Sequence, residues 1–198
     1  MSMQPPGTRP RDSTPMVLPF PRPGRLIQDA YQDLEVAANS SLQRLSTFSG
    51  LDDLPRPWDP ARCTDRDLRL ELWAWLDAVV SWHNHQQVWD AHATIPACWP
   101  HHPHLVHQIA VLADQRHHAG QALTSDLLED WHRYTLPAFT DRMNNQLREH
   151  CADSHQPWPA QGRHSRYQAE SSRAERQGRF ESDTSTWTFP QTATGGRL

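Results

Sequence analysis

The chain has 198 residues, enough for one domain of ordinary size with further segments at its ends. Hydrophobic residues make up 36% of the sequence, its mean hydropathy is -0.80 and seventeen residues are prolines, so packing along the whole length is excluded. The net charge of -4 argues against nucleic-acid binding by the chain as a whole.

The three cysteines are too few and too scattered for a disulfide framework. The N-terminus lacks the apolar run of a signal peptide, and no stretch approaches the roughly 18 apolar residues that a membrane span needs. Met1 and Met16 are both candidate start sites. We therefore expect a cytoplasmic protein.

Residues 1–24 contain seven prolines and no hydrophobic periodicity, which predicts a disordered, Pro-rich segment. From residue 26 apolar side chains recur at helical spacing, and this pattern predicts an amphipathic helix that ends near Gly50. Its apolar positions are Ile27, Tyr31, Leu34, Ala38, Leu42 and Leu45. The proline-rich stretch 51–63 then predicts a loop.

A second helix is expected from residue 65, with Thr64 or Asp65 as its cap, to about residue 92. This run of about 28 residues would be about 42 Å long. One face carries Leu68, Leu72, Trp75, Leu76, Val79 and Trp82.

Two further helices complete the predicted fold. The first begins at Pro103 and stops near Gly120, and the second begins at Thr124 or Ser125 and reaches about Cys151. Pro137 should kink the second, because the carbonyl of Arg133 loses its partner. The inner face of this helix is predicted to carry Leu127, Leu128, Trp131, Tyr134, Thr135 and Ala138.

The pattern as a whole predicts an all-α protein, a bundle of about four helices over residues 25–151. Residues 152–198 are polar and are expected to form a largely disordered tail, in which an Arg/Glu-rich helix around 165–181 has little to bury.

The stretch "IPACWPHHPHLVHQIAVLADQRHHAG", residues 95–120, is rich in histidine. Cys98 and His101 have the spacing of a first zinc-ligand pair, and His104 with His107 would supply a second. The helical periodicity opposes this, because these last two histidines fall opposite the apolar stripe centred on Ile109. The favoured interpretation is a helix start with surface histidines and no cofactor. Zinc bound by Cys98, His101, His104 and His107 is the alternative.

Polar residues also continue the apolar faces of the predicted helices: His83, Asp90, Arg116 and Arg142. They are either exposed helix ends, a buried structural pair, or a pocket. A pair would join Asp90 to Arg116, and a pocket would use His83 as an acid or base.

Two carboxylate-x-x-His pairs, Asp114 with His117 and Glu129 with His132, have the spacing found in di-iron bundles. Their carboxylates lie away from the apolar faces, and two further carboxylates are not evident. No phosphate-binding loop or common hydrolase motif occurs. The sequence therefore does not favour an enzyme.

The histidine-rich stretch and "LTSDLLEDWHRYTLPAFTDRM" resemble a group of actinobacterial proteins of unknown function. The shared block runs Cys-Trp-Pro, His-Pro, a helix, then Trp-His-Arg-Tyr and Leu-Pro, over roughly residues 70–170 of the chain. The resemblance implies a context of plasmids or integrative elements, and it carries over no catalytic residue.

We expect a helical accessory or interaction protein whose partner is another protein or a second copy of itself. Trp73 and Trp89 lie on opposite flanks of their helix, where they either pack against neighbours or form a contact patch. Weak nucleic-acid binding is an alternative, since residues 163–179 hold five arginines against two glutamates. The zinc protein described above is the other.

Overall fold

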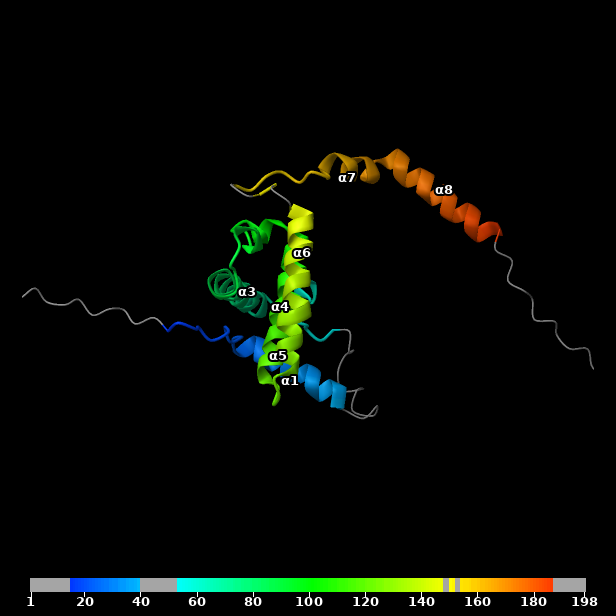
Figure 1. Ribbon diagram of the computed structural model, residues 1–198. Coiled ribbons are helices and arrows are strands. Elements are labelled where there is room, and N and C mark those ends of the chain that lie inside the picture. The colour runs from blue at the N-terminus through cyan, green and yellow to red at the C-terminus, as the bar shows by residue number, and fades with distance from the viewer. Residues whose placement is uncertain (1–14, 40–52, 148–149, 152–153, 187–198) are drawn as a thin grey trace, which may run out of the picture. The chain divides into compact units, whose positions relative to one another are not determined.

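The computed structural model describes residues 15–39, 53–147, 150–151 and 154–186 (Figure 1). All regular elements among these residues are helical, with no strand, which confirms the all-α prediction. The chain divides into two compact units, Met1–Ser154 and His155–Leu198, and each is described by itself.

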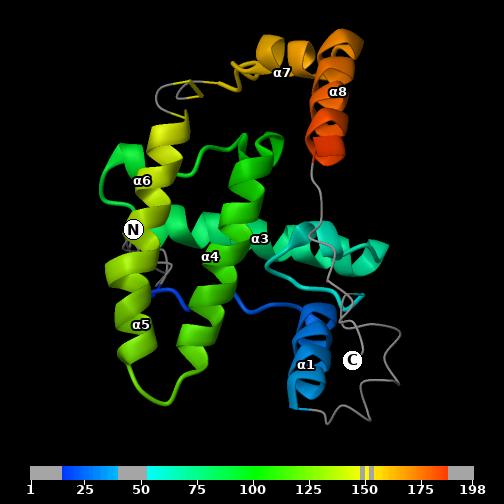
Figure 2. The same cartoon turned by 90° about the vertical axis from the view of Figure 1, so that its right-hand side faces the viewer.

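The first unit is built from α1 (Arg25–Asn39), α3 (Arg66–Gln86), α4 (Pro103–Gln121), α5 (Asp126–Asp130) and α6 (Leu136–Leu147). Figure 2 shows α5 and α6 running alongside α4, with α3 crossing them and α1 below. Short 3-10 turns occur at Pro60–Arg62, Ala91–Ala93 and Trp99–His101. The helices outnumber the four predicted, because one predicted helix is divided and two more follow residue 154.

The segment 15–24 differs from the prediction of a disordered N-terminus. Its Leu18 and Phe20 pack against the core. The indole Nε1 of Trp82 donates to the carbonyl of Leu18 at 3.1 Å, and that of Trp75 donates to the carbonyl of Pro21 at 3.0 Å. These two tryptophans therefore hold in place a proline-rich segment that has no hydrophobic periodicity of its own.

Helix α1 agrees with the predicted start, and its predicted continuation over residues 40–46 lies outside the described residues. Asp65 caps α3, as expected, by accepting hydrogen bonds from the amides of Asp67 and Leu68. However, α3 ends at Gln86 rather than near residue 92. The Asn84 side chain exchanges two hydrogen bonds of 2.9 Å with the backbone of Ile95, which fastens the returning chain against the helix end.

The predicted kink before Pro137 is a π-helical turn, Trp131–Thr135, between α5 and α6. Proline has no N–H for the Arg133 carbonyl, and a single wider turn accommodates the missing bond without ending the helix. The turn keeps Trp131 buried, and its indole donates to the carbonyl of Leu112 at 3.2 Å.

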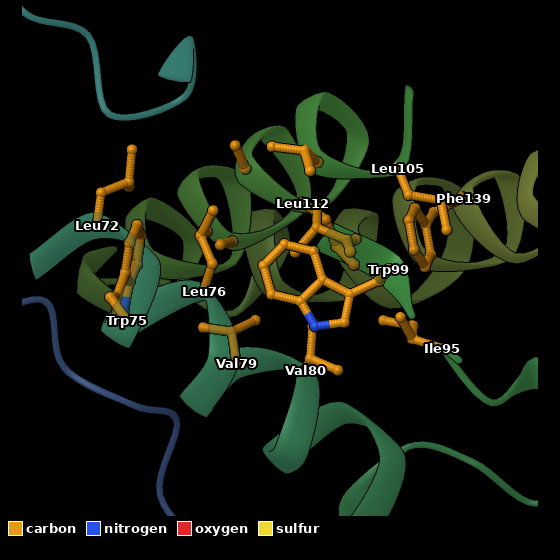
Figure 3. Packing of buried hydrophobic residues seen from close by; sticks show 14 of the residues in the cluster. Leu72, Trp75, Leu76, Val79, Val80, Ile95, Trp99, Leu105, Leu112 and Phe139 are labelled. Carbon is orange, nitrogen blue, oxygen red and sulfur yellow. The ribbon is translucent and has the colours of Figure 1, made fainter. Parts of the chain in front are cut away.

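The core joins α3, α4 and α6 around one tryptophan from the turn before α4. Figure 3 shows Trp99 lying among Leu76, Val79, Val80 and Leu112. Trp99 is 3% exposed and its ring centre is 5.8 Å from that of Trp73. The turn that precedes α4 is therefore anchored in the core by this side chain.

The second unit contains α7 (Gln161–Gln168) and α8 (Glu170–Thr186), in the region predicted to be largely disordered. Its hydrophobic side chains are exposed, as the sequence indicated: Trp158, Tyr167 and Phe180. Arg176 stacks on the Tyr167 ring with its guanidinium 3.8 Å from the ring centre. In the described part of the chain no helix has the length and apolar character needed to cross a membrane.

Candidate metal centre

Four side chains that can ligate a metal meet beside the start of α4. They are Cys98, His102, Cys151 and His155, and their ligand atoms all lie within 4.8 Å of one another. His102 and Cys151 are buried, Cys98 is partly buried and His155 is exposed. Two thiols and two imidazoles are the ligand set of tetrahedral structural zinc sites.

The first two ligands are placed by proline and tryptophan. Cys98 precedes the 3-10 turn that Trp99 anchors in the core, and His102 is the N-cap of α4. His102 has extended backbone angles, φ -116° and ψ 92°, as the residue before Pro103 must. Its carbonyl accepts from the amides of Leu105 and Val106, so the turn and the helix start form one rigid unit.

The third ligand comes from the segment that follows α6. Cys151 lies four residues beyond Leu147, the last residue of α6, and the residue is 5% exposed. His155 follows at the fourth position after this cysteine, so the chain itself keeps the imidazole within reach of the thiol. The two pairs, Cys98 with His102 and Cys151 with His155, therefore have the same Cys-x-x-x-His spacing.

The distances fit a tetrahedral ion. Nε2 of His102 is 3.4 Å from Sγ of Cys98 and 3.5 Å from Sγ of Cys151. Zinc bonds of about 2.3 Å to sulfur and about 2.05 Å to nitrogen, at a tetrahedral angle, separate the two ligand atoms by about 3.6 Å. One nitrogen and two sulfurs are thus already spaced as such an ion requires.

Without a metal the Cys98 thiol is favoured over its thiolate. Burial raises the pKa of the Cys98 thiol, and the neighbouring Cys151 sulfur raises it further. Two thiolates this close repel each other, whereas a divalent cation between them removes that repulsion. A dication with two thiolates and two neutral imidazoles makes a site of zero net charge.

Only Cys98 belongs both to this cluster and to the ligand set expected from sequence. His101, His104 and His107 are exposed and contribute no ligand atom to it. The exposure of His104 and His107 agrees with the expectation that these two face away from the core. The missed ligands are His102, four residues after Cys98, and Cys151 with His155. Cys151 lies 49 residues beyond His102, and the signal that could have found these ligands is the repeated Cys-x-x-x-His spacing.

The four polar residues considered as exposed helix ends, a buried pair or a pocket contact different groups. His83 is 2% exposed, and its Nε2 lies 3.2 Å from the carbonyl of Ala93. Burial lowers the pKa of His83, which favours the neutral ring. Asp90 is exposed and accepts from the amide of His92, so it caps a 3-10 turn instead of pairing with Arg116. Arg142 is exposed on α6.

Arg116 occupies a cage of three aromatic rings. The centre of its guanidinium is 5.1 Å from the Phe20 ring centre and 5.7 Å from those of Trp82 and Trp131. Burial lowers the pKa of the Arg116 guanidinium, yet the group stays charged at any physiological pH. This is a structural contact that joins the N-terminal segment to α3 and α4.

A second polar cluster connects α1 to α4. The Tyr31 hydroxyl donates to Oδ1 of Asp114 at 2.8 Å, and Nδ1 of His118 lies 3.4 Å from the same oxygen. The hydrogen bond to Asp114 raises the pKa of His118. Asp114 belongs to one of the two carboxylate-x-x-His pairs considered from sequence. The carboxylate of the other pair, Glu129, is exposed, so these residues do not form a di-iron site.

An open groove of about 280 Å³ lies between α4 on one side and the π-turn and α6 on the other. Its walls are apolar and amide side chains together with Thr135, Arg142 and His107, and no carboxylate lines it. Oε1 of Gln108 is buried there without a hydrogen-bond partner, and its Nε2 donates to Gln146 at 2.9 Å.

In comparisons with known proteins the chain matches no family model, no curated protein and no solved structure. The resemblance to actinobacterial proteins of unknown function stays a prediction.

Proposed function

We propose that this is a non-enzymatic zinc-binding protein, in which Zn²⁺ held by Cys98, His102, Cys151 and His155 fastens the segment after α6 to the turn before α4. The observation that carries this proposal is the meeting of two Cys-x-x-x-His pairs that are distant in the sequence. Cys/His clusters of this composition bind zinc in preference to hard cations, because thiolate and imidazole are soft or intermediate ligands.

The site is better suited to a structural than to a catalytic ion. Catalytic zinc sites have three protein ligands and leave the fourth position to water or substrate. Here four protein donors fill a tetrahedral shell, and two of them are buried. The ion would therefore activate no water.

Such an ion would add a strong link at a place where few side chains hold the segment after α6 to the rest of the first unit. The segment after α6 has one buried side chain, Cys151, among its described residues up to His155. Closing a long loop through a metal restricts the unfolded chain more than it restricts the folded one. We therefore expect zinc to stabilise the protein and to order the segment that carries its third and fourth ligands.

The test is the metal content of untagged protein, followed by thermal unfolding with and without a chelator. We expect one zinc per chain. Removal of the ion should lower the melting temperature by on the order of 10 °C, since free zinc at about 1,000 times its dissociation constant stabilises by about 4 kcal/mol. Cobalt substitution reads the ligands directly, because thiolate-to-cobalt charge transfer is absent when only nitrogen and oxygen bind.

Variants distinguish this site from the one expected from sequence. Cys151→Ser and His102→Asn should lose stoichiometric zinc and weaken the cobalt charge-transfer band. His101→Asn and His107→Asn are matched controls on the same turn and helix, and both should retain the ion. If the Cys151 and His102 variants keep zinc and the His101 and His107 variants lose it, the ion binds instead at Cys98, His101, His104 and His107. No binding of zinc in a titration would exclude both sites.

The interaction role expected from sequence remains a proposal with less support. Trp73 packs against Trp99, whereas Trp89 is fully exposed and available for a partner. Four of the five arginines of α7 and α8 are exposed, which supports weak binding of an acidic partner or nucleic acid. A structural zinc site is compatible with either role, because it concerns how the scaffold is held together.

A further inference from the structure

The metal cluster contains two of the three cysteines, and the sulfur atoms of these two lie close together. Both Sγ atoms contact the same nitrogen, Nε2 of His102, at 3.4 and 3.5 Å. All ligand atoms lie within 4.8 Å of one another, so the two sulfurs are within that distance too. A disulfide has a sulfur–sulfur bond of about 2.05 Å, and a sulfur movement of at most a few ångströms would close it.

We infer that Cys98 and Cys151 form a thiol–disulfide switch that controls occupancy of the zinc site, so that oxidation by a peroxide expels the ion and reduction restores it. This inference rests on the zinc site proposed above. It adds a regulation that a permanent structural ion would not have.

The two sulfurs differ in access, which sets the order of steps. Cys98 is partly buried whereas Cys151 is buried, so hydrogen peroxide reaches Cys98 first. The Cys98 thiolate attacks one peroxide oxygen, the O–O bond breaks, and a sulfenic acid and hydroxide form. The Cys151 thiolate then attacks the Cys98 sulfur and displaces a second hydroxide, which gives the disulfide.

The oxidation is balanced in electrons and protons, and the ion leaves unchanged. The two thiolates give up two electrons, the peroxide accepts both, and two protons from solvent convert the hydroxides to water. Zn²⁺ is neither oxidised nor reduced. It loses two of its four donors, and two neutral imidazoles alone hold it weakly.

The oxidised protein retains a connection between the same two segments. The disulfide joins the turn before α4 to the segment after α6, as the ion does, but it releases His102 and His155 from ligation. Oxidation therefore changes the state of the two imidazoles rather than opening the first unit.

The third cysteine provides an internal control. Cys63 is fully buried, its Sγ lies 3.5 Å from the carbonyl of Arg56, and it is not part of the cluster. Burial raises the pKa of its thiol, which makes it a poor nucleophile. A Cys63→Ala variant should bind and release zinc as the unmodified chain does, and it leaves only the two cluster thiols to be counted.

The experiment uses the full chain, first titrated with zinc under reducing conditions and then freed of reductant and exposed to one equivalent of hydrogen peroxide. A zinc-sensitive dye should report loss of the bound ion, with the loss of two thiols per chain. Tryptic digestion should join the peptide 70–116, which contains Cys98, to the peptide 149–163, which contains Cys151. Dithiothreitol with added zinc should reverse all three changes.

The first stage decides the zinc site and the second decides the switch. A chain that binds no zinc in the reducing titration fails at the first stage, and the regulation falls with the site. Zinc that binds and is then retained under peroxide, or leaves while the two peptides stay unlinked, overturns the switch alone. Cys98→Ser should also abolish the linkage to the peptide that contains Cys151. A disulfide from Cys151 to Cys63 in that variant would likewise overturn the switch alone.

Discussion

Arg116 is held in an apolar environment by aromatic faces instead of a carboxylate. Its guanidinium lies over the rings of Phe20, Trp82 and Trp131, and its buried Nε has no hydrogen-bond partner in the described structure. A guanidinium is planar and more weakly hydrated than an ammonium ion, so it loses less on leaving water and stacks well on rings.

We expect Arg116→Ala to lower the free energy of unfolding by about 1–2 kcal/mol, through lost cation–π attraction and lost packing of the side-chain stem. Arg116→Lys should lie between this variant and the unmodified chain, because an ammonium pays more for desolvation. Arg142→Ala, an exposed arginine on α6, is the control and should change stability by less than about 0.5 kcal/mol. Urea unfolding measures all three, and equal losses for Arg116→Ala and Arg142→Ala would contradict the cage.

Helical periodicity identified Arg116 as a residue on the apolar stripe of α4, but it did not identify the partner. Asp90 was expected on the same face as His83 because the preceding helix was extended to about residue 92. The helix ends at Gln86, and the Asn84 side chain in its last turn binds the backbone of Ile95, eleven residues further along the chain. Such a side-chain contact leaves no periodic trace in the sequence.

At the level of elements, the segment 15–24 acts as part of the core. The amide of Leu18 donates to Oε1 of Gln86 at 2.9 Å, and Phe20 lies edge-on to Trp82 with ring centres 5.1 Å apart. Together with the two indole hydrogen bonds, these contacts cover one side of α3. Prolines suit this segment, because a stretch of chain whose carbonyls accept the hydrogen bonds needs few N–H groups.

Deleting residues 1–24 should therefore destabilise the protein by several kcal/mol, since it exposes Trp75 and Trp82 and leaves two indole N–H groups without their acceptors. Deleting residues 1–14 keeps every one of these contacts and should change stability little. Chemical unfolding monitored by tryptophan fluorescence compares the two chains with the full one. Similar stability for both deletions would show that the segment contributes nothing to the core.

The helix that contains Pro137 shows which part of an element its sequence predicts. The kink follows from one missing N–H, and it was predicted at the right place. The form of the kink was not predictable in the same way, because a π-turn rotates all following side chains relative to an α-helix, by about 100° for the one additional residue. Tyr134, which lies within this turn and is predicted from sequence on the inner face, is 61% exposed.

At the level of the whole molecule, the cluster depends on contacts that no local pattern specifies. Sequence spacing singled out Cys98 and a zinc chemistry, and it also contained the second Cys-x-x-x-His pair. It could not bring Cys151 to His102, because that meeting follows from how α6 packs along α4. Local patterns favoured histidines close in sequence, whereas the fold selected the one that caps α4 and is buried.

Two truncations that differ by three residues test how much of the chain the metal centre needs. A chain of residues 1–157 contains all four ligands, and one of residues 1–154 lacks only His155. We expect the first to bind zinc as tightly as the full chain, since α7 and α8 supply no ligand. The second should bind more weakly, because water replaces an imidazole in the fourth position. Competition with a chromophoric chelator measures both affinities, with His155→Ala in the full chain as the matched substitution. Equal affinity for the two truncations would remove His155 from the site, and weak binding by residues 1–157 would mean that the helices beyond it take part in holding the ion.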